Sequence, residues 1–323
     1  MKRCVILALA HCPVSSVVGP LEILLLADRL AAADPQSQAA RWQIEVVAEE
    51  HTHIAGNGGV GLSAHCSLAQ VTQADLVIVA AIGDPRLRSE PLADSTLAWL
   101  RRCHQQGSQL VSICTGAYVL ASAGLLQGRR ATSHWAVIDW LAQQFPDCDW
   151  QKGAMLTEDG EIACSGGASA YQDMSLLLVR QHFGDAIARQ VARSVLIDLD
   201  RHSQLQYASF MPHRQHQDQL IHGIQDWLQQ HACDAVSSEQ LAQRAHLSER
   251  QFKRRFKQAV QLTPLAYIQA LRMEAAKQAL ENSVKQVEVI ARECGYDDVR
   301  FFRQLFRRNC GLTPTEYRAK FTP

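Results

Sequence analysis

The feature that most constrains the fold is an internal duplication in the last third of the chain. Residues 241–268 and 290–318 share their apolar positions, at an offset of 49 residues before a turn and 50 after it. Phe252, for example, matches Phe302. Two copies are too few for a solenoid, which needs about three. The duplication therefore predicts a pair of small helical modules, the second with one extra residue in its turn.

Capping signals predict a short helix, a turn and a second helix in each copy. Ser237 and Ser248 are each followed three residues later by glutamine, which is the pattern of a capping box. The Thr-Pro pairs at 263–264 and 313–314 place a cap residue before a proline at the first helical position. Residues 264–280 are rich in helix formers, so they predict one helix that joins the copies.

The second helix of each copy combines an apolar face with a basic face. At 100° per residue, Phe252 and Phe256 lie about 40° apart, and Phe302 and Phe306 repeat this spacing. The opposite face carries Arg250, Lys253, Arg254, Lys257, Arg300, Arg303, Gln304 and Arg307. Such side chains reach base edges and phosphates when a helix enters the major groove. One copy alone could be an ordinary solvated cationic face, but two matched copies favour DNA recognition.

The C-terminal third, about residues 220–320, resembles the AraC-type DNA-binding domain in both helix-turn-helix units, the joining helix and the closing "GLTPTEYR". The resemblance implies two recognition helices in successive major grooves of bent double-stranded DNA, about 34 Å apart. The very basic "RQFKRRFK" departs from the family pattern and indicates heavier phosphate contact. The charge distribution agrees with DNA binding by this part of the chain. Residues 205–323 are basic, with 17 Lys and Arg against 12 Asp and Glu, whereas residues 1–204 are acidic, with 15 against 20.

The first two thirds of the chain alternate strand-like and helix-like segments. Near-continuous apolar strands such as "LVIVAAI" between amphipathic helices predict an α/β fold with a doubly wound parallel sheet, amidotransferase-like or flavodoxin-like, ahead of an all-α domain. The expected strands are 4–10, 42–48, 76–82, 110–114 and 161–165, and the expected helices are 21–33, 95–106, 117–125, 136–145 and 170–183. The expected domains are 1–204 for sensing and dimerisation, a linker at 205–218, and 219–323 for DNA binding.

Several features limit where the chain works and what it binds. No apolar run approaches the roughly 18 residues of a membrane helix, and the short run 4–10 is expected to be a buried strand rather than a secretory signal. The ten cysteines include no C-x-x-C pair, so we expect free thiols, a cytoplasmic location, and neither metal nor cofactor. Residues 51–61 hold two histidines but no third metal ligand at suitable spacing, and are expected to form a flexible loop.

"VSICTGAYVLASAGLL" (111–126) passes from a strand-like run into a helical pattern at Cys114, with the small residues Ser112 and Gly116 on either side. A nucleophile on such a turn needs small neighbours. Ligands of a doubly wound sheet bind at the carboxyl ends of the strands, where Cys114 is expected. The pattern therefore predicts an exposed thiol at the mouth of a cleft, with its pKa lowered by the helix N-terminus.

Three segments of this region resemble the DJ-1/PfpI family, a branch of the class I glutamine amidotransferase-like fold: "GPLEILLLADRL" (19–30), "CTGAYVLASAGLLQGRRATSHW" (114–135) and "GGASAYQDMSLLLVRQHFG" (166–184). The resemblance places Cys114 at the elbow, Glu22 at the acidic position and His134 at the histidine position. His11, Thr115 and His65 are further candidates for the same cleft. In a catalyst, Glu22 would tune the thiol and His134 would act as base. "AAIGDP", with one glycine where the family often has two, argues against a complete oxyanion hole.

An amidotransferase-like domain joined to an AraC-type domain resembles the GlxA-like branch of AraC-family transcriptional regulators. That resemblance implies a bacterial activator that works with RNA polymerase, forms a homodimer through its N-terminal domain, and senses a small molecule. The expected effector is amino-acid-like or a quaternary amine, and its binding would shift the population of DNA-binding states. Two alternatives stay open: a cysteine-dependent hydrolase or amidotransferase-like enzyme, and a redox sensor that uses Cys114. We expect a sensor and not an enzyme.

Overall fold

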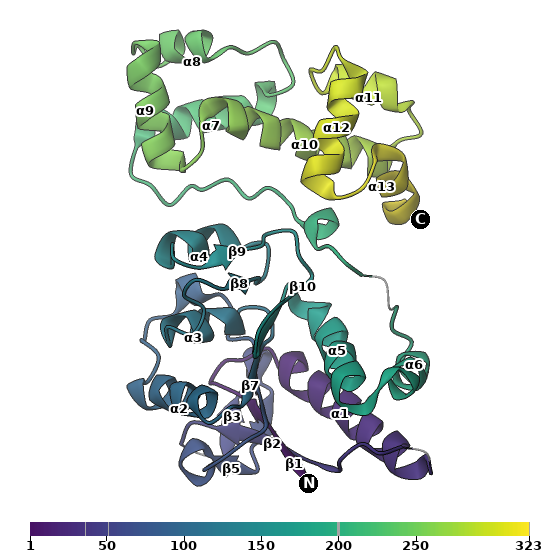
Figure 1. Cartoon of the computed structure of the whole chain (residues 1–323). Coiled ribbons are helices and arrows are strands. Elements are labelled where there is room, and N and C mark those ends of the chain that lie inside the picture. The colour runs from purple at the N-terminus through teal and green to yellow at the C-terminus, as the bar shows by residue number, and fades with distance from the viewer. Residues whose placement is uncertain (36, 51, 199–200, 323) are drawn as a thin grey trace. The chain divides into compact units, whose positions relative to one another are not determined.

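The computed structural model describes residues 1–35, 37–50, 52–198 and 201–322. The chain divides into two compact units, residues 1–204 and residues 205–323 (Figure 1). The first is an α/β unit and the second is entirely helical in its regular structure. The predicted fold class is therefore confirmed.

A seven-stranded sheet forms the centre of the α/β unit, in the order β10-β11-β7-β6-β1-β2-β5. All neighbouring pairs are parallel except β10 with β11, which is antiparallel. The strands are β1 (Lys2–Leu7), β2 (Trp42–Ala48), β5 (Cys66–Ser67), β6 (Leu76–Val79), β7 (Gln109–Ser112), β10 (Leu156–Asp159) and β11 (Ile162–Ser165). The carboxyl ends of β6, β7 and β11 meet at one edge, which positions the elbow described below.

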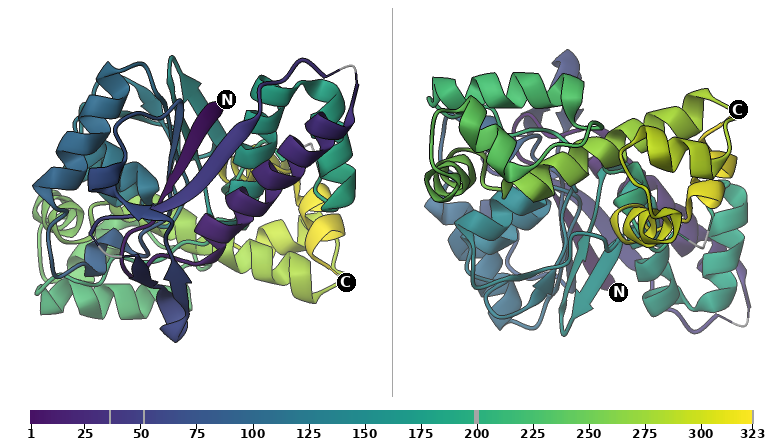
Figure 2. Two further views of the ribbon diagram at one scale, coloured as in Figure 1. Left: turned by 90° about the horizontal axis from the view of Figure 1, so that it is seen from below. Right: turned by 90° about the horizontal axis from the view of Figure 1, so that it is seen from above.

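Helices cover both faces of this sheet (Figures 1 and 2). One side holds α1 (Ser15–Ala33), α5 (Tyr171–Phe183) and α6 (Asp185–Ser194), whereas the other holds α2 (Asp94–Gln105), α3 (Gly116–Ser122) and α4 (Ile138–Gln144). Successive side chains of a strand point to opposite faces. Cys4 and Ile6 accordingly pack in the core under α1 and α5, while Val5 and Leu7 pack in the core under α2 and α3.

Several element boundaries differ from those expected. The first strand ends at Leu7 and β6 ends at Val79; the residues expected to continue them form connections that are buried except at Ala10. Helix α1 begins six residues before its expected start and takes in Pro20. Pro20 is the sixth residue of this helix and has no N–H to donate to the carbonyl of Ser16, so the helix continues past it without that hydrogen bond. Helix α6 was not expected.

The segment expected to be a flexible loop contains a small antiparallel hairpin, β3 (His53–Ala55) with β4 (Gly61–Ser63). The first of its two histidines, His51, lies outside the described residues. Another short pair, β8 (Arg130–Ala131) with β9 (Asp149–Trp150), is parallel and was also not expected.

The helical unit contains the predicted duplication. Helices α8 and α9 form one helix-turn-helix, α11 and α12 form the other, and α10 joins them (Figure 1). The capping boxes at Ser237 and Ser248 both form, and the joining helix is confirmed. The helices are α7 (Gln219–His231), α8 (Ser238–Arg244), α9 (Glu249–Val260), α10 (Pro264–Asn282), α11 (Val287–Glu293), α12 (Val299–Cys310) and α13 (Pro314–Phe321).

The two copies have equivalent cores. The rings of Phe256 and Tyr267 are centred 5.4 Å apart at 78°, and those of Phe306 and Tyr317 are 5.4 Å apart at 84°. Edge-on aromatic pairs of this kind contribute about 0.5–1.5 kcal/mol beyond their buried area. The apolar positions of the duplication therefore define the same packing twice.

The turns of the two copies differ by the predicted extra residue. The first turn has His246 at φ 52° before the cap Ser248, and the second has Gly295 at φ 79° before the cap Asp298. A Cβ at Gly295 would lie 2.6 Å from the carbonyl oxygen of Cys233, so only glycine fits there. The additional residue, Asp297, falls in the second turn.

Residues 205–218, which we expected to link the domains, contact the helices of the second unit. Lys277 donates to the carbonyl of Ala208 at 2.6 Å, and the ring of Phe210 packs edge-on against Tyr267. At its end, Asp218 caps α7 by accepting from the N–H of Ile221. The segment thus forms an arm that lies against the helical unit.

Candidate functional sites

The eight residues predicted to contact DNA are all exposed on α9 and α12. Phe252 and Phe256 behind α9, and Phe302 and Phe306 behind α12, have no exposed surface. Each helix therefore has an inner face that fixes its position and an outer face that is free for a partner.

Most of the positive charge on this outer face is not neutralised by ion pairs among the described residues. Lys253 pairs with Glu249 one turn earlier, and Arg303 pairs with Glu288 of α11. Within the described part of the chain, no ion pair is found for Arg250, Arg254, Lys257, Arg300 or Arg307. Exposed guanidinium and ammonium groups without an intramolecular partner are suited to contacting phosphates.

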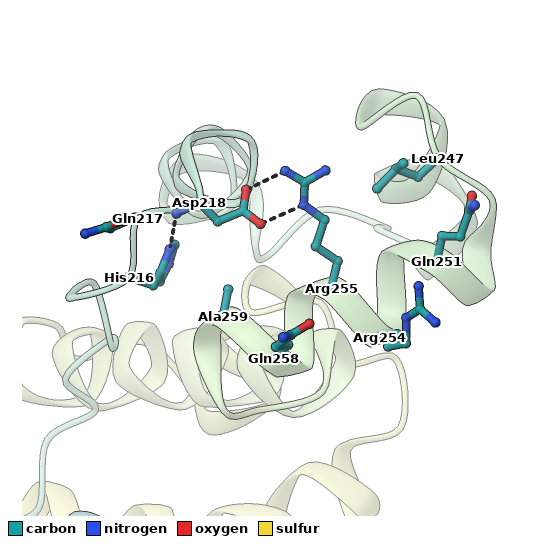
Figure 3. A pocket seen from close by; sticks show the side chains of 9 residues that line it. All are labelled: His216, Gln217, Asp218, Leu247, Gln251, Arg254, Arg255, Gln258 and Ala259. Atoms are coloured by element: carbon teal, nitrogen blue, oxygen red, sulfur yellow. Dashed lines mark hydrogen bonds and ion pairs between the residues drawn. The ribbon is translucent and has the colours of Figure 1, made fainter.

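Arg255, which the helical geometry leaves off the predicted DNA-binding face, has a structural role instead. Its Nε and one terminal nitrogen donate to the two carboxylate oxygens of Asp218, at 2.6 and 2.9 Å (Figure 3). The guanidinium also lowers the pKa of the Asp218 carboxyl. The pair attaches the arm to α9, beside a pocket of about 510 Å³ that Arg254 also lines.

The second candidate site is the elbow at the carboxyl end of β7. Cys114 has φ 54°, in the left-handed region. A Cβ at Gly116 would lie 2.5 Å from the carbonyl oxygen of Val79, so a larger residue would push the turn away from β6. The predicted strand-to-helix elbow, and its need for a small neighbour, thus have a direct steric cause.

The thiol at this elbow is buried, contrary to our expectation. Cys114 is 6% exposed, and burial raises the pKa of its thiol to about 12. Hydrogen bonds from the backbone and side chain of Thr115 favour the thiolate, but their effect is smaller than that of burial. The helix N-terminus therefore does not make this cysteine acidic, and the neutral thiol is a poor nucleophile.

Glu22 makes no hydrogen bond to the elbow among the described residues. It is exposed on α1 and lines a pocket of about 420 Å³ together with Leu25, Arg29 and Tyr171. The α1 residue that reaches the strand ends is Ser16, which accepts a hydrogen bond from the N–H of Ala81 at 3.1 Å. An uncharged serine six residues earlier gave no sequence signal for this position.

His134 is half-buried and its ring is turned toward its own loop. Its Nδ1 accepts from the N–H of Ala136 at 3.1 Å, and burial lowers its pKa, with Asp84 opposing and Arg86 adding to the shift. Among the described residues, no hydrogen bond joins His134 to Cys114. The neighbouring Ser133 contacts the elbow instead, by donating to the Cys114 carbonyl at 2.9 Å.

The remaining candidates have individual backbone roles. Thr115 is buried in the elbow and accepts from the N–H of Ile82 at 3.0 Å. His11 is exposed with φ 63°, and its N–H donates to the carbonyl of Ala55. His65 is exposed, and its Nδ1 accepts from the N–H of Val46 at 3.0 Å. Only Thr115 of these three contributes to the elbow itself.

Sequence reasoning missed Gln204, the last residue of the α/β unit. Its side chain is buried, and its Nε2 donates to the carbonyl of Ser133 at 2.8 Å. Its Oε1 accepts from the N–H groups of Trp135, at 3.1 Å, and Gly167, at 3.2 Å. A polar residue in a polar segment far along the chain carries no pattern that would place it beside the elbow.

Cys233, in the helical unit, has a more acidic thiol than Cys114. The thiol of Cys294 hydrogen-bonds to Cys233, and this lowers the pKa of Cys233 while raising that of Cys294. Both belong to the helical unit, in the turn after α7 and at the end of α11. All ten cysteines are free thiols, and the described residues contain no cluster of three or more His, Cys, Asp or Glu that could hold a metal ion.

Comparisons with known proteins agree with both halves of this structure. Residues 14–181 match the DJ-1/PfpI family, and residues 241–320 match a helix-turn-helix domain. The chain belongs to the DJ-1/PfpI family, in the branch that carries an AraC-type helix-turn-helix domain at its C-terminal end. In the described residues, no helix is long and apolar enough to cross a membrane.

Two curated relatives cover most of the chain. The HTH-type transcriptional regulator CdhR of Pseudomonas aeruginosa is 28% identical over 95% of this chain and 88% of its own length. The HTH-type transcriptional regulator GlxA of Rhizobium meliloti is 25% identical over 90% of this chain and 89% of its own length. These relatives support DNA-binding regulation as the class of function.

Among solved structures, a putative transcriptional regulator from Vibrio parahaemolyticus matches with a TM-score of 0.54 and 26% identity, over 60% of this chain and 98% of that one. The Drosophila melanogaster protein DJ-1beta matches with a TM-score of 0.51 over 61% of this chain and 98% of its own length. At 18% identity, the second likeness supports the fold alone.

Proposed function

We propose that the chain is a sequence-specific transcriptional regulator that binds double-stranded DNA through α9 and α12. The observation that carries this proposal is the pair of equivalent helices, each fixed by buried phenylalanines and each presenting unneutralised cations outward. The proposed contacts are Arg250, Lys253, Arg254 and Lys257 of α9, and Arg300, Arg303, Gln304 and Arg307 of α12. DNA as partner also makes the cytoplasm the proposed location.

The test is DNA affinity after the double substitution Arg254→Ala and Arg303→Ala. Each lost contact to a base or phosphate is expected to cost about 1–3 kcal/mol, so affinity should fall by about 100-fold. Arg189→Ala with Arg193→Ala on α6 removes the same charge from exposed positions of the α/β unit. Equal affinity losses in the two double variants, measured by fluorescence anisotropy, would contradict the proposed surface.

We further propose that the α/β unit binds a small effector near the elbow and mediates homodimerisation. A turn held by Thr115, Ser133 and Gly116 at the carboxyl ends of parallel strands supports the location of the effector site. The proposed effector is amino-acid-like or a quaternary amine, and the proposed outcome is activation together with RNA polymerase. Exposed Leu25, Val195 and Leu196 support a dimer surface on the α1 side.

A metabolite screen by thermal shift tests the effector proposal, because a ligand that binds only the folded state raises the Tm. If no amino acid or betaine raises it, the proposed effector class is wrong. Enzymatic and redox roles for Cys114 are not proposed, because its thiol is buried and neutral and has no base within hydrogen-bond reach among the described residues.

A further inference from the structure

The side-chain amide of Gln204 connects three loops at the carboxyl edge of the sheet. Its Nε2 donates to the carbonyl of Ser133 at 2.8 Å, and to those of Lys152 and Ala154 at 3.2 Å each. Its Oε1 accepts from the N–H groups of Trp135 and Gly167. These five backbone groups, which we call the amide cradle, come from the loops after β8, before β10 and after β11.

The cradle is built around this side chain. A Cβ at Gly166 would lie 2.9 Å from the Gln204 carboxamide, so glycine is needed to leave room for it. Gln204 itself is 2% exposed. A buried amide with both of its ends satisfied is costly to remove without replacement, because each unpaired group then loses its hydrogen bond.

The cradle also contacts the elbow directly. Ser133, whose carbonyl accepts from Gln204, donates its hydroxyl to the carbonyl of Cys114 at 2.9 Å. On the opposite side, Ser165 precedes the cradle loop after β11, and its hydroxyl accepts from the N–H of Cys114 at 3.3 Å. The buried Gln204 is therefore joined to the elbow of the proposed effector site through Ser133.

The chemistry of the cradle defines what could take the place of Gln204. Three carbonyl oxygens require a group with N–H donors, and two N–H groups require an oxygen acceptor. A primary carboxamide satisfies both, and so does an amino acid with its ammonium and carboxylate groups. A quaternary ammonium has no N–H to donate and leaves the carbonyls of Ser133 and Lys152 without a donor among the described residues, whereas that of Ala154 keeps the hydroxyl of Thr132.

We propose that Gln204 is an internal ligand of this cradle and that the effector regulates the protein by displacing it. The inference rests on the proposed effector site and narrows its occupant to a small molecule that carries both an N–H donor and an oxygen acceptor. Because Leu205 begins the helical unit, displacement of Gln204 releases the point at which the two units are joined. Effector binding and the state of the DNA-binding unit are thereby coupled.

The test uses the full chain with Gln204→Gly and the probe propionamide, which has the same heavy atoms as the deleted side chain. The variant should lose about 5 °C in Tm, because four of the five cradle groups lose the hydrogen bond that Gln204 supplies and gain no other. Propionamide should raise the Tm of the variant by several degrees and leave that of the original chain unchanged. Glycine should also raise the Tm of the variant, whereas glycine betaine, which has methyl groups in place of N–H, should not.

Ile187→Ala is the matched control, because it opens a cavity in the same unit under α6, away from the cradle. If propionamide stabilises both variants equally, or neither, the cradle does not accept a ligand and the inference is wrong. The inference also fails if the Gln204 variant binds DNA with the same affinity as the original chain, because loss of the anchored side chain should have the same effect as its displacement. DNA binding by the original chain is tested with the arginine variants above, so these failures leave the proposed function standing.

Discussion

The elbow at Cys114 and the turn before the first recognition helix have the same backbone conformation, but the helices that follow them differ in burial and charge. Cys114 and His246 both adopt left-handed backbone angles, φ 54° and 52°, just before a helix. The helix after Cys114 is mostly buried, and the cysteine is left as a neutral thiol. The helix after His246 buries only its phenylalanine face and exposes a row of cations. Backbone geometry alone therefore does not identify the surface that binds a partner, because burial decides whether the side chains there are charged and accessible.

Thiol reactivity gives the largest expected contrast between the two units. At pH 7 a thiol with a pKa of about 12 is almost entirely protonated, whereas hydrogen bonding lowers the pKa of Cys233 below its usual value. Iodoacetamide should therefore modify Cys233 at least about 1000-fold faster than Cys114. Peptide mass spectrometry after timed labelling measures the two rates, with Cys233→Ser as control. Faster labelling of Cys114 would restore the redox alternative.

Removing a phenylalanine behind a recognition helix should strongly destabilise the helical unit. Phe302→Ala deletes a fully buried ring and is expected to cost about 3–5 kcal/mol in the free energy of unfolding. Phe301→Ala is the matched control, because its ring is 47% exposed and its loss should cost less than about 1 kcal/mol. Similar costs from urea denaturation would show that the inner face of α12 is assigned incorrectly.

Salt should act on the cationic surface and leave the elbow unaffected. If about five phosphates are contacted, raising the salt from 50 to 200 mM should weaken DNA binding by about 500-fold. Cys114→Ala should show the same slope of log affinity against log salt, because the residue is neutral and buried. A slope near zero for the unsubstituted chain would exclude binding by these cations.

Acid should destabilise the α/β unit by a smaller amount. The ring of His182 is centred 4.8 Å from that of Trp42 and tilted by 58° to it, and burial together with the charge of Lys2 lowers the pKa of His182 to about 4. In the unfolded chain His182 therefore binds a proton near pH 6.5, whereas in the folded chain it binds one only near pH 4. Stability should fall as the pH drops through this window, by about 1–2 kcal/mol from this group after allowing for its partial exposure. His182→Gln should remove that part of the pH dependence in urea titrations, and an unchanged dependence would exclude His182 as its source.

Sequence patterns predicted the helical unit more completely than the elbow, for a physical reason. Phe252 and Phe302 belong to a periodic pattern that appears twice, and the caps Ser237 and Ser248 act on residues only three positions away. Such local effects can be read from neighbouring residues. The contacts of Gln204 instead depend on how distant loops meet, which no local pattern encodes.

The ionisation of the elbow cysteine could not be predicted from the sequence either. The backbone of the turn follows from small residues beside Cys114, but the pKa of the thiol depends on helices and strands packed around it. Glu22 has the residue type that a cysteine site needs, yet it lies on the exposed face of α1 while Ser16 reaches the strand ends. The type of a side chain can be read from the sequence, whereas its direction depends on the register of the helix against the sheet.

The most direct test of the central claim compares DNA affinity for Cys114→Ala and for Arg254→Ala with Arg303→Ala, measured by fluorescence anisotropy on one promoter duplex at one salt concentration. If the recognition helices carry the function and the elbow holds a ligand without turning it over, the cysteine variant should bind within about twofold of the original chain. The arginine variant should bind about 100-fold more weakly. Loss of binding in the cysteine variant, with affinity retained in the arginine variant, would contradict the account.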